Sequence, residues 1–153
     1  MNDFIIIIDS KEKKPYLFQN IKPKPPVTIV RGLKTGDYSV LDLEDKVCVE
    51  RKSLPDLFGS VGNGRQRFER EMVRLSKFKY AALVVESDYK NWFVNSPARS
   101  KMPAKAVFRT VIAWSQRYNV HVWPAWNRES GERFTYLILK RYFDDYIKKM
   151  EEV

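Results

Sequence analysis

Residues 47–57 read Val-Cys-Val-Glu-Arg-Lys-Ser-Leu-Pro-Asp-Leu, and this stretch predicts a strand that runs directly into a helix. The apolar start is typical of a buried strand, which we expect over residues 47–52. Ser53 then takes the N-cap position of a helix, with Pro55 in the first turn and Asp56 at the third position. A strand followed at once by a helix is a building block of an α/β domain.

The strand pairing expected around this stretch brings two carboxylates and a lysine together. Side chains alternate along a strand, so Glu50 and Lys52 project from the same face. Asp37 begins another strand, near residues 38–41, and a polar turn at residues 42–46 follows it. This pattern predicts a hairpin that places Asp37 beside Glu50.

These three side chains have the chemistry that phosphodiester hydrolysis requires. Two carboxylates can hold Mg²⁺, which polarises a phosphate oxygen and lowers the pKa of a bound water. The lysine can stabilise hydroxide and the added negative charge of the transition state. The pattern therefore predicts catalytic roles for Asp37, Glu50 and Lys52. The alternative is chance, because an acidic residue followed at variable distance by Glu-x-Lys also occurs in proteins without such a function.

The remaining segments alternate between strands and helices, which predicts an α/β domain with a central mixed sheet flanked by helices. Further strands are expected at residues 4–8, 27–30, 80–85 and 120–123, and helices from Arg65 onward, over 103–118 and over 130–150. Glycines predict a turn over residues 59–64. No internal repeat or domain boundary is visible, so residues 1–153 are expected to form a single domain.

The charge balance narrows the class of partner. Lysine and arginine number 28 against 19 acidic residues, a net charge of +9, which favours a polyanion such as nucleic acid. A single cysteine excludes an internal disulfide. With only one histidine in addition, the sequence argues against a zinc site, so we expect Mg²⁺, with Mn²⁺ able to substitute. No stretch has the length of a membrane span and no secretory signal is visible, which predicts an intracellular protein without a membrane partner.

The order of the charged residues resembles a known signature. Gly-Asp at 36–37, Glu-Arg-Lys at 50–52 and Asp56 are similar to the GDXnERKXXXD motif of the ERCC4-type nuclease domain, found in the XPF/Mus81 family of structure-specific endonucleases. Residues 9–12, Asp-Ser-Lys-Glu, resemble the family's D-x-R-E, and residues 63–65, Asn-Gly-Arg, resemble its D-G-R turn. The likeness extends over most of the chain.

The resemblance implies a restriction-endonuclease-like fold with a PD-(D/E)XK core, and Mg²⁺-dependent cleavage of branched or flapped DNA. It assigns Lys52 to activation of the water and makes Arg51 a supporting member of the catalytic group. The metal ligands that it implies are Asp37, Glu50, Asp9 and Asp56.

Two features depart from the family pattern. Family members usually carry a tandem helix-hairpin-helix module that binds branched DNA and dimerises, whereas this chain ends at Val153. We therefore expect a nuclease domain that stands alone, of a kind that would suit a virus or a mobile element. Lys11 replaces an arginine of the motif, which keeps the charge but loses the bidentate guanidinium.

Several of the singled-out residues also have purely structural explanations. Asp56 fits the third position of a helix capping arrangement, and Asp9 fits a turn at the end of a strand. Arg65 begins a helix after a glycine turn, where it either binds an anion or is simply solvated. His121 and Cys48 lie in apolar strands and are expected to be structural.

Basic side chains in loops and at the start of a helix are the candidates for contact with DNA phosphates. One loop contains proline and lysine at residues 22–26, and another is polar and basic over residues 95–105. The predicted DNA-binding residues are Lys22, Lys24, Arg65, Arg67, Arg99, Lys101 and Lys105.

The final helix has a wider apolar arc than a single small core requires, which predicts a homodimer through this helix. One apolar edge consists of Phe134, Leu137 and Ile138; the other consists of Tyr136, Leu139, Phe143, Tyr146, Ile147 and Met150. The preceding helix offers Val107, Val111 and Trp114 as further contributors. The alternative is that the helix of residues 103–118 packs against this arc within one subunit.

Taken together, these features predict a metal-dependent DNA endonuclease acting on branched or flapped DNA. One alternative is a nuclease of the same fold that reads duplex sequence. Another is a non-catalytic DNA-binding subunit, which is disfavoured because such subunits lose the acidic residues or the Glu-Arg-Lys present here. A basic RNA- or ribosome-associated protein would have no use for carboxylates on a buried strand.

Overall fold

The structure is a computed structural model that describes residues 3–88, 90, 92, 96–97 and 100–153. Its strands are β1 (Ile5–Asp9), β2 (Val27–Arg31), β3 (Tyr38–Val40), β4 (Val47–Ser53), β5 (Tyr80–Glu86) and β6 (His121–Ala125). Its helices are α1 (Leu54–Val61), α2 (Arg65–Leu75), α4 (Ala104–Tyr118) and α5 (Arg128–Glu151). Among the described residues, no helix combines the length and the apolar character needed to cross a membrane.

The strands form one mixed sheet in the order β2-β1-β3-β4-β5-β6. β1 and β2 are parallel, β3 is antiparallel to both β1 and β4, and β4, β5 and β6 run parallel to one another. The hairpin predicted around the polar turn is present, since Tyr38 of β3 pairs with Val49 of β4. The predicted α/β class with a central mixed sheet is confirmed.

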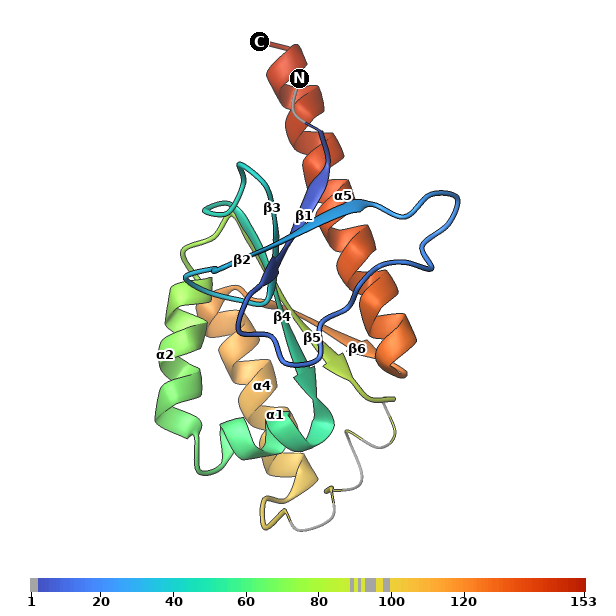
Figure 1. Ribbon diagram of the computed structural model, residues 1–153. Helices are drawn as coiled ribbons and strands as arrows, with labels where there is room; N and C mark the ends of the chain where they lie inside the picture. Colours follow the sequence, from blue (N-terminus) through green and yellow to red (C-terminus); the bar gives the residue numbers. More distant parts are fainter. Residues whose placement is uncertain (1–2, 89, 91, 93–95, 98–99) are drawn as a thin grey trace.

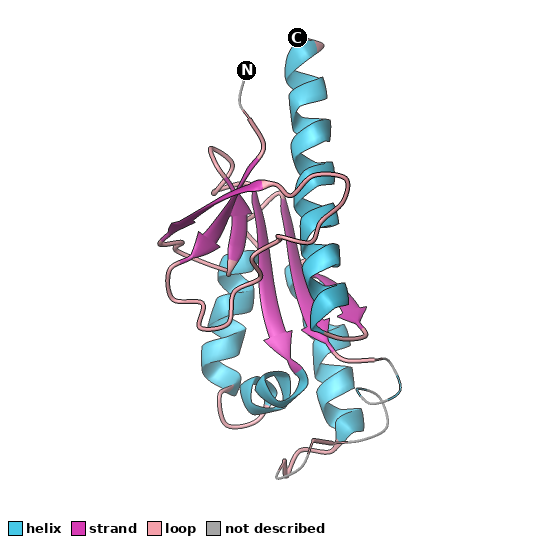
Figure 2. Cartoon of the chain, turned by 45° about the vertical axis from the view of Figure 1, so that its right-hand side comes forward, coloured by secondary structure: helices cyan, strands magenta, loops and turns pink. Residues whose placement is uncertain are grey.

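Helices cover both faces of the sheet (Figures 1 and 2). α1, α2 and α4 lie on one face, and the long α5 runs along the other. The alternation of side chains along β5 explains the two cores. Ala81, Leu83 and Val85 pack with the three helices, whereas Ala82 and Val84 pack under α5. A strand buried on both faces needs an almost continuous apolar sequence, and β5 has one.

α5 uses much of its apolar arc inside the subunit. Leu139 is 0% exposed and Phe143 is 8% exposed, because both pack on the sheet. Leu139 and Phe143 are therefore not available to a partner, and their predicted part in a dimer interface is wrong. Val107, Val111 and Trp114 are buried under α4 on the opposite face, so their expected contribution to a shared surface is also wrong. The sheet separates α4 from α5, which overturns the alternative in which these two helices pack together.

The structure shifts several element boundaries from those expected from the sequence. α1 continues to Val61, so the predicted glycine turn shrinks to residues 62–64. α5 begins at Arg128, because the side chain of Asn127 accepts a hydrogen bond from the N–H of Ser130 at 2.8 Å and so caps the helix earlier.

Two helical glycines should respond in opposite ways to alanine. A Cβ at Gly59 in α1 would meet no heavy atom within 4 Å. Gly59→Ala should therefore raise the free energy of unfolding by about 0.5–1 kcal/mol, because alanine loses less backbone entropy on folding. A Cβ at Gly131 in α5 would collide with the hydroxyl oxygen of Tyr16. Gly131→Ala should lower the free energy of unfolding by about 1–3 kcal/mol.

Urea denaturation followed by circular dichroism measures both variants against the unsubstituted protein. Equal shifts of the two midpoints, in either direction, would contradict this account of the two positions.

Candidate active site

A cleft of about 830 Å³ opens where β4 runs into α1. The end of β1, the residue before β3, the ends of β4 and β5, and parts of α1, α2 and α5 contribute to its walls. Its acidic lining residues are Asp9, Glu12, Asp37, Glu50, Asp56, Glu71 and Glu86, and its basic ones are Lys11, Lys13, Lys14, Arg51, Lys52, Arg67 and Arg128. The cleft thus combines a group of carboxylates with many positive charges.

The backbone of Asp37 is held from two sides. The N–H of Asp9 donates to the carbonyl oxygen of Asp37 at 2.8 Å. The N–H of Asp37 donates to the carbonyl oxygen of Val49 at 2.9 Å. The preceding residue, Gly36, has a φ of +82°, and a Cβ there would collide with the Sγ of Cys48. The glycine of the Gly-Asp pair is therefore required by the local backbone.

The side chains of the three predicted catalytic residues line the same cleft. The Oδ2 of Asp37 accepts a hydrogen bond from the N–H of Arg51 at 2.8 Å. Glu50 is only 8% exposed. The Nζ of Lys52 lies 3.6 Å from the Oε1 of Glu50 and 5.0 Å from the ring centre of Phe68. Glu50 and Lys52 therefore share one face of β4, as the alternation of the strand predicts.

Both carboxyl groups lie where a negative charge is unfavourable. Burial raises the pKa of Glu50 well above its ordinary value, and the charges of Asp37 and Glu71 raise it further. Burial also raises the pKa of Asp37, to about 6, against the opposing hydrogen bond from the amide of Arg51. The ammonium of Lys52 offsets only part of this repulsion.

The donor chemistry of this pair fits a divalent cation. Carboxylate oxygens are the ligands that Mg²⁺ and Mn²⁺ prefer, and a cation between Asp37 and Glu50 would relieve their repulsion. Across the part of the chain that the structure describes, no group of three or more His, Cys, Asp or Glu side chains is arranged to hold a metal ion. The fit is therefore to an open centre, in which two carboxylates hold the ion and water or substrate oxygens complete its shell.

Glu71 of α2 is a member of this cluster that sequence reasoning missed. It lines the cleft, is hydrogen-bonded to Glu50, and its charge raises the pKa of both Asp37 and Glu50. The helical period places it about one turn after Phe68, the ring that contacts Lys52. This spacing is the one signal in the sequence that could have indicated Glu71. It is informative only once Phe68 is known to contact Lys52.

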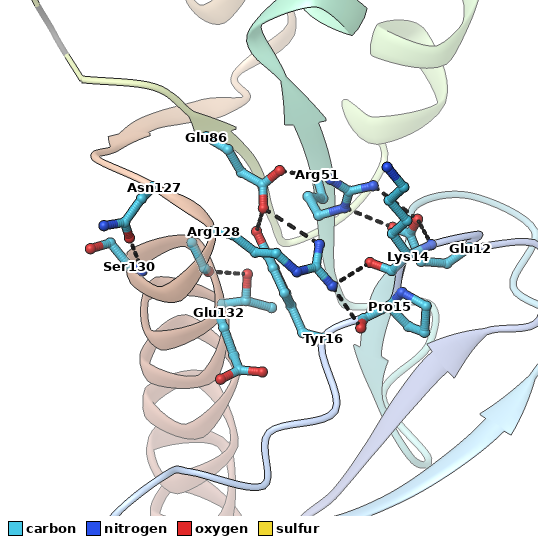
Figure 3. A network of polar contacts seen from close by, with 12 residues as sticks. Glu12, Lys14, Pro15, Tyr16, Arg51, Glu86, Asn127, Arg128, Ser130 and Glu132 are labelled. Carbon is cyan, nitrogen blue, oxygen red and sulfur yellow. Dashed lines mark hydrogen bonds and ion pairs between the residues drawn. The ribbon is translucent and has the colours of Figure 1, made fainter.

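Arg51 projects from the opposite face of β4 into a second polar network, shown in Figure 3. Its Nε and Nη2 donate to the two carboxylate oxygens of Glu12 at 3.0 and 3.1 Å, and its Nη1 donates to Glu86 at 2.7 Å. The hydroxyl of Tyr16 donates to the other oxygen of Glu86 at 2.6 Å. The guanidinium of Arg51 is thus engaged by two carboxylates, while its backbone N–H holds the side chain of Asp37.

This network also joins distant parts of the chain. The Nη2 of Arg128, at the start of α5, donates to the carbonyl oxygens of Lys14 and Pro15 at 2.7 and 2.8 Å. Burial raises the pKa of Glu12, but hydrogen bonds from Arg51 and from the amide of Lys14 outweigh it, so the pKa lies below its ordinary value. Glu12 therefore stays charged, and the loop after β1 is tied to β4 and α5.

The two further acidic residues that the sequence singled out line the cleft and also have structural contacts. The Oδ1 of Asp9 accepts a hydrogen bond from the N–H of Leu33 at 2.9 Å, which fixes the loop after β2. The N–H of Asp56 donates to the hydroxyl of Ser53 at 3.2 Å, which confirms the predicted N-cap of α1.

The residues predicted to bind DNA are distributed over several surfaces. Arg67 lines the cleft, whereas Arg65 and Lys101 line a neighbouring hollow of about 720 Å³. Lys105 is exposed in the first turn of α4. Arg99 lies outside the described residues.

Two predicted DNA contacts are remote from the cleft. Lys22 and Lys24 are exposed in the loop between β1 and β2 and do not line the cleft. In Figure 1 this loop extends past α5, on the side away from α1 and α2. Three basic residues that sequence reasoning did not propose as contacts, Lys11, Lys13 and Lys14, line the cleft instead. They follow β1 directly, and the structure brings the end of that strand beside β4.

Comparison with known proteins agrees with this architecture. The family model described as "ERCC4 domain" matches residues 8–138. XPF from Aeropyrum pernix is similar in structure, with a TM-score of 0.72 and 17% sequence identity over 90% of this chain and 61% of that chain. XPF from Aeropyrum pernix in complex with DNA gives a TM-score of 0.66 and 17% identity over 93% of this chain and 66% of that chain. No curated relative matches the sequence.

These similarities bear on the fold. The chain spans about three fifths to two thirds of the length of the two solved structures. At 17% identity the likeness shows a shared architecture, which is the restriction-endonuclease-like fold. The predicted fold is therefore confirmed.

The raised pKa of Asp37 should make stability depend on pH. A carboxyl group whose folded pKa is about 6, above its unfolded value of 3.8, stabilises the fold when protonated, and that contribution is lost as pH rises through 6. In EDTA at about pH 8, Asp37→Asn should raise the free energy of unfolding by about 1–3 kcal/mol. At about pH 3, below the unfolded value of 3.8, the variant and the unsubstituted protein should be nearly equal, because Asp37 is then protonated in both the folded and the unfolded state.

Urea denaturation at both pH values measures this difference. Addition of Mg²⁺ at the higher pH should stabilise the unsubstituted protein more than the variant. A gain that is the same at both pH values would show that the carboxyl group of Asp37 is not strained in the fold.

Proposed function

Because the chain belongs to the ERCC4 domain family, we propose that it is a metal-dependent DNA endonuclease that hydrolyses phosphodiester bonds. The observation that carries this proposal is the buried Glu50, 8% exposed, which lies in an open cleft with Asp37 and has the Nζ of Lys52 at 3.6 Å. A carboxylate with a purely structural role is normally compensated in full by its partners. Here the compensation is partial, and the cleft is open to a substrate.

In the proposed reaction a water molecule attacks phosphorus, and the bond from phosphorus to the leaving sugar oxygen breaks. Asp37 and Glu50 would hold Mg²⁺, or Mn²⁺ in its place, which when bound polarises a phosphate oxygen and makes a water molecule more acidic. The ammonium of Lys52 stabilises the negative charge that develops in the transition state. Its contacts with Glu50 and Phe68 hold it in position before the substrate arrives.

We propose branched or flapped DNA as the substrate. Lysines and arginines line the cleft beside the carboxylates, and positive charges of this kind bind a phosphate backbone. One of the similar solved structures is XPF in complex with DNA, which supports a nucleic acid as the partner. The same charges would also suit a nuclease that reads duplex sequence or a DNA-binding subunit without activity.

Labelled flap, fork, four-way and linear duplex DNAs, each incubated with Mg²⁺ or with EDTA, separate these three functions. Cleavage of flap or fork DNA in Mg²⁺ alone supports the proposal. Cleavage of linear duplex at one sequence would favour the sequence-reading nuclease, and binding without cleavage of any DNA would favour the inactive subunit.

We further propose that the protein is a homodimer through α5 and the neighbouring edge of the sheet. An apolar groove of about 470 Å³ is lined by Tyr80, Trp123, Phe134, Leu137, Ile138, Arg141, Tyr142 and Asp145. Leu137 is 54% exposed and Trp123 is 43% exposed. Aromatic residues with arginine at the rim are the composition of a protein interface, and β6 is an edge strand that pairing would cover.

Substitution of the catalytic group tests the reaction. Asp37→Asn and Glu50→Gln should abolish cleavage while DNA binding stays near normal or tightens, because each removes a metal ligand and a repulsive charge. Lys52→Ala should lower the single-turnover rate by about 10²–10³-fold and retain metal binding, because its charge acts mainly in the transition state. Fluorescence anisotropy measures binding, and calorimetry measures metal affinity.

Asp3→Asn, at an exposed position that does not line the cleft, is the matched control and should leave the rate unchanged. Undiminished turnover in Asp37→Asn or Glu50→Gln would exclude this site. Loss of metal affinity in Lys52→Ala would assign the lysine a structural role.

Light scattering at micromolar concentration tests the dimer. Leu137→Glu should yield folded monomers near 18.1 kDa, because it places a charge in the centre of the apolar groove. Met150→Glu is the matched control, since Met150 is similarly exposed on the same helix, at 59%, but does not line the groove. A mass near 18.1 kDa for the unsubstituted protein would overturn the homodimer.

A further inference from the structure

The middle of α1 contains a glycine that the fold itself does not require. Gly59 is exposed, its φ is not in the left-handed region, and a Cβ there would meet no heavy atom within 4 Å. The C-cap of the helix is a different glycine, Gly62. Glycine inside a helix is destabilising relative to alanine, and close approach of another molecule is a reason for its presence.

Gly59 lies on a ridge between two hollows. On one side is the cleft of about 830 Å³ that contains the catalytic pair, and on the other is the hollow of about 720 Å³. Pro55 and Gly59, one helical turn apart, line both. Asp56 and Ser60 line the cleft, and Phe58 lines the far hollow. Pro55 and Gly59 therefore form the crest of α1, the line that separates the two hollows. The ridge is low along this crest, because proline has a short side chain and glycine has none.

The far hollow presents positive charge at defined positions. The guanidinium of Arg65 lies 5.0 Å from the ring centre of Trp114, and its Nη1 lies 3.4 Å from the hydroxyl oxygen of Thr110. Lys101 is exposed, and the neighbouring Met102 packs against the end of α1. A phosphate that crossed the ridge from the cleft would meet these two cations.

We propose that a DNA strand in the cleft continues over α1 at Gly59 and is bound on the far side by Arg65 and Lys101. This inference rests on the proposed function, because a branched substrate bound in the cleft is what supplies a strand at that point. The occupant is an unpaired arm of the branched substrate. A single strand bends at each nucleotide and can follow a helix surface, whereas duplex DNA is stiff over about 150 base pairs.

Binding measurements in EDTA test the path without cleavage. Fluorescence anisotropy compares a blunt duplex with the same duplex carrying an unpaired arm of about eight nucleotides. The unsubstituted protein should bind the arm-bearing DNA about fivefold more tightly, as expected for a few added phosphate contacts. Gly59→Gln, which places a long neutral side chain on the crest, should reduce this preference to less than about twofold.

A second variant tests the far side of the ridge. Lys101→Ala should lower the salt slope of binding by about one for arm-bearing DNA and leave the slope for blunt duplex unchanged. The matched controls are Gly32→Gln and Lys79→Ala. Both positions are exposed, neither lines the cleft or the far hollow, and a Cβ at Gly32 would meet its nearest atom at 3.7 Å. Both controls should keep the arm preference of the unsubstituted protein.

The outcomes separate this inference from the proposed function. A folded Gly59→Gln that keeps the arm preference would overturn the path, as would an unsubstituted protein without any preference. If Gly59→Gln does not fold, Lys101→Ala decides instead. An equal decrease in salt slope for the arm-bearing DNA and the blunt duplex would then overturn the path. Cleavage in Mg²⁺ without an arm preference would leave the proposed function standing and remove the path. An arm preference without cleavage of any DNA would leave the path standing and remove the proposed function.

Discussion

The burial of Glu50 inside a sheet is the constraint on which the rest of the site depends. A charged carboxylate in a dry environment is unfavourable unless its surroundings compensate it. Lys52, two residues further along the same face of β4, provides a positive charge at 3.6 Å, and the ring of Phe68 positions that ammonium. Asp37 and Glu71 act in the opposite direction and raise the pKa of Glu50. Partial compensation of this kind is typical of a centre that uses its charge in chemistry.

The alternation of β4 divides two tasks between its faces. One face presents Glu50 and Lys52 to the cleft, and the other presents Arg51 to Glu12 and Glu86 (Figure 3). Loss of one partner from such a network leaves a charge without compensation, which is strongly destabilising. The network therefore holds the loop after β1, the end of β5 and the start of α5 around the cleft. The positions of the cleft walls depend on Arg51 even though its guanidinium faces away from Glu50.

The order of the strands separates the cleft from the apolar groove. β4 lies inside the sheet and can be covered on both faces, whereas β6 is an edge strand. The groove includes Tyr80 at the start of β5, and the cleft includes Glu86 at its end. A partner bound in the groove would therefore lie at the opposite end of β5 from the cleft. Pairing of two subunits and access of DNA are compatible for that reason.

The sequence by itself determined the features that depend on near neighbours in the chain. The strand over residues 47–52, its passage into a helix capped by Ser53, and the shared face of Glu50 and Lys52 follow from alternation and capping, which act over a few residues. The α/β class follows from the succession of such local elements. The motif that includes Asp37 and Glu50 is likewise visible in the order of the residues alone.

Only the tertiary structure decided what each face meets. Periodicity shows that residues share a face, but the partner of that face depends on strand order and on segments far apart in sequence. Glu71 joins the cluster because α2 packs beside β4, and Arg51 is engaged because Glu12 and Glu86 converge on it from 39 and 35 residues away. Leu139 and Phe143 face the sheet rather than a partner for the same reason. Local rules carry no information about these long-range contacts, since their geometry exists only once the sheet has assembled.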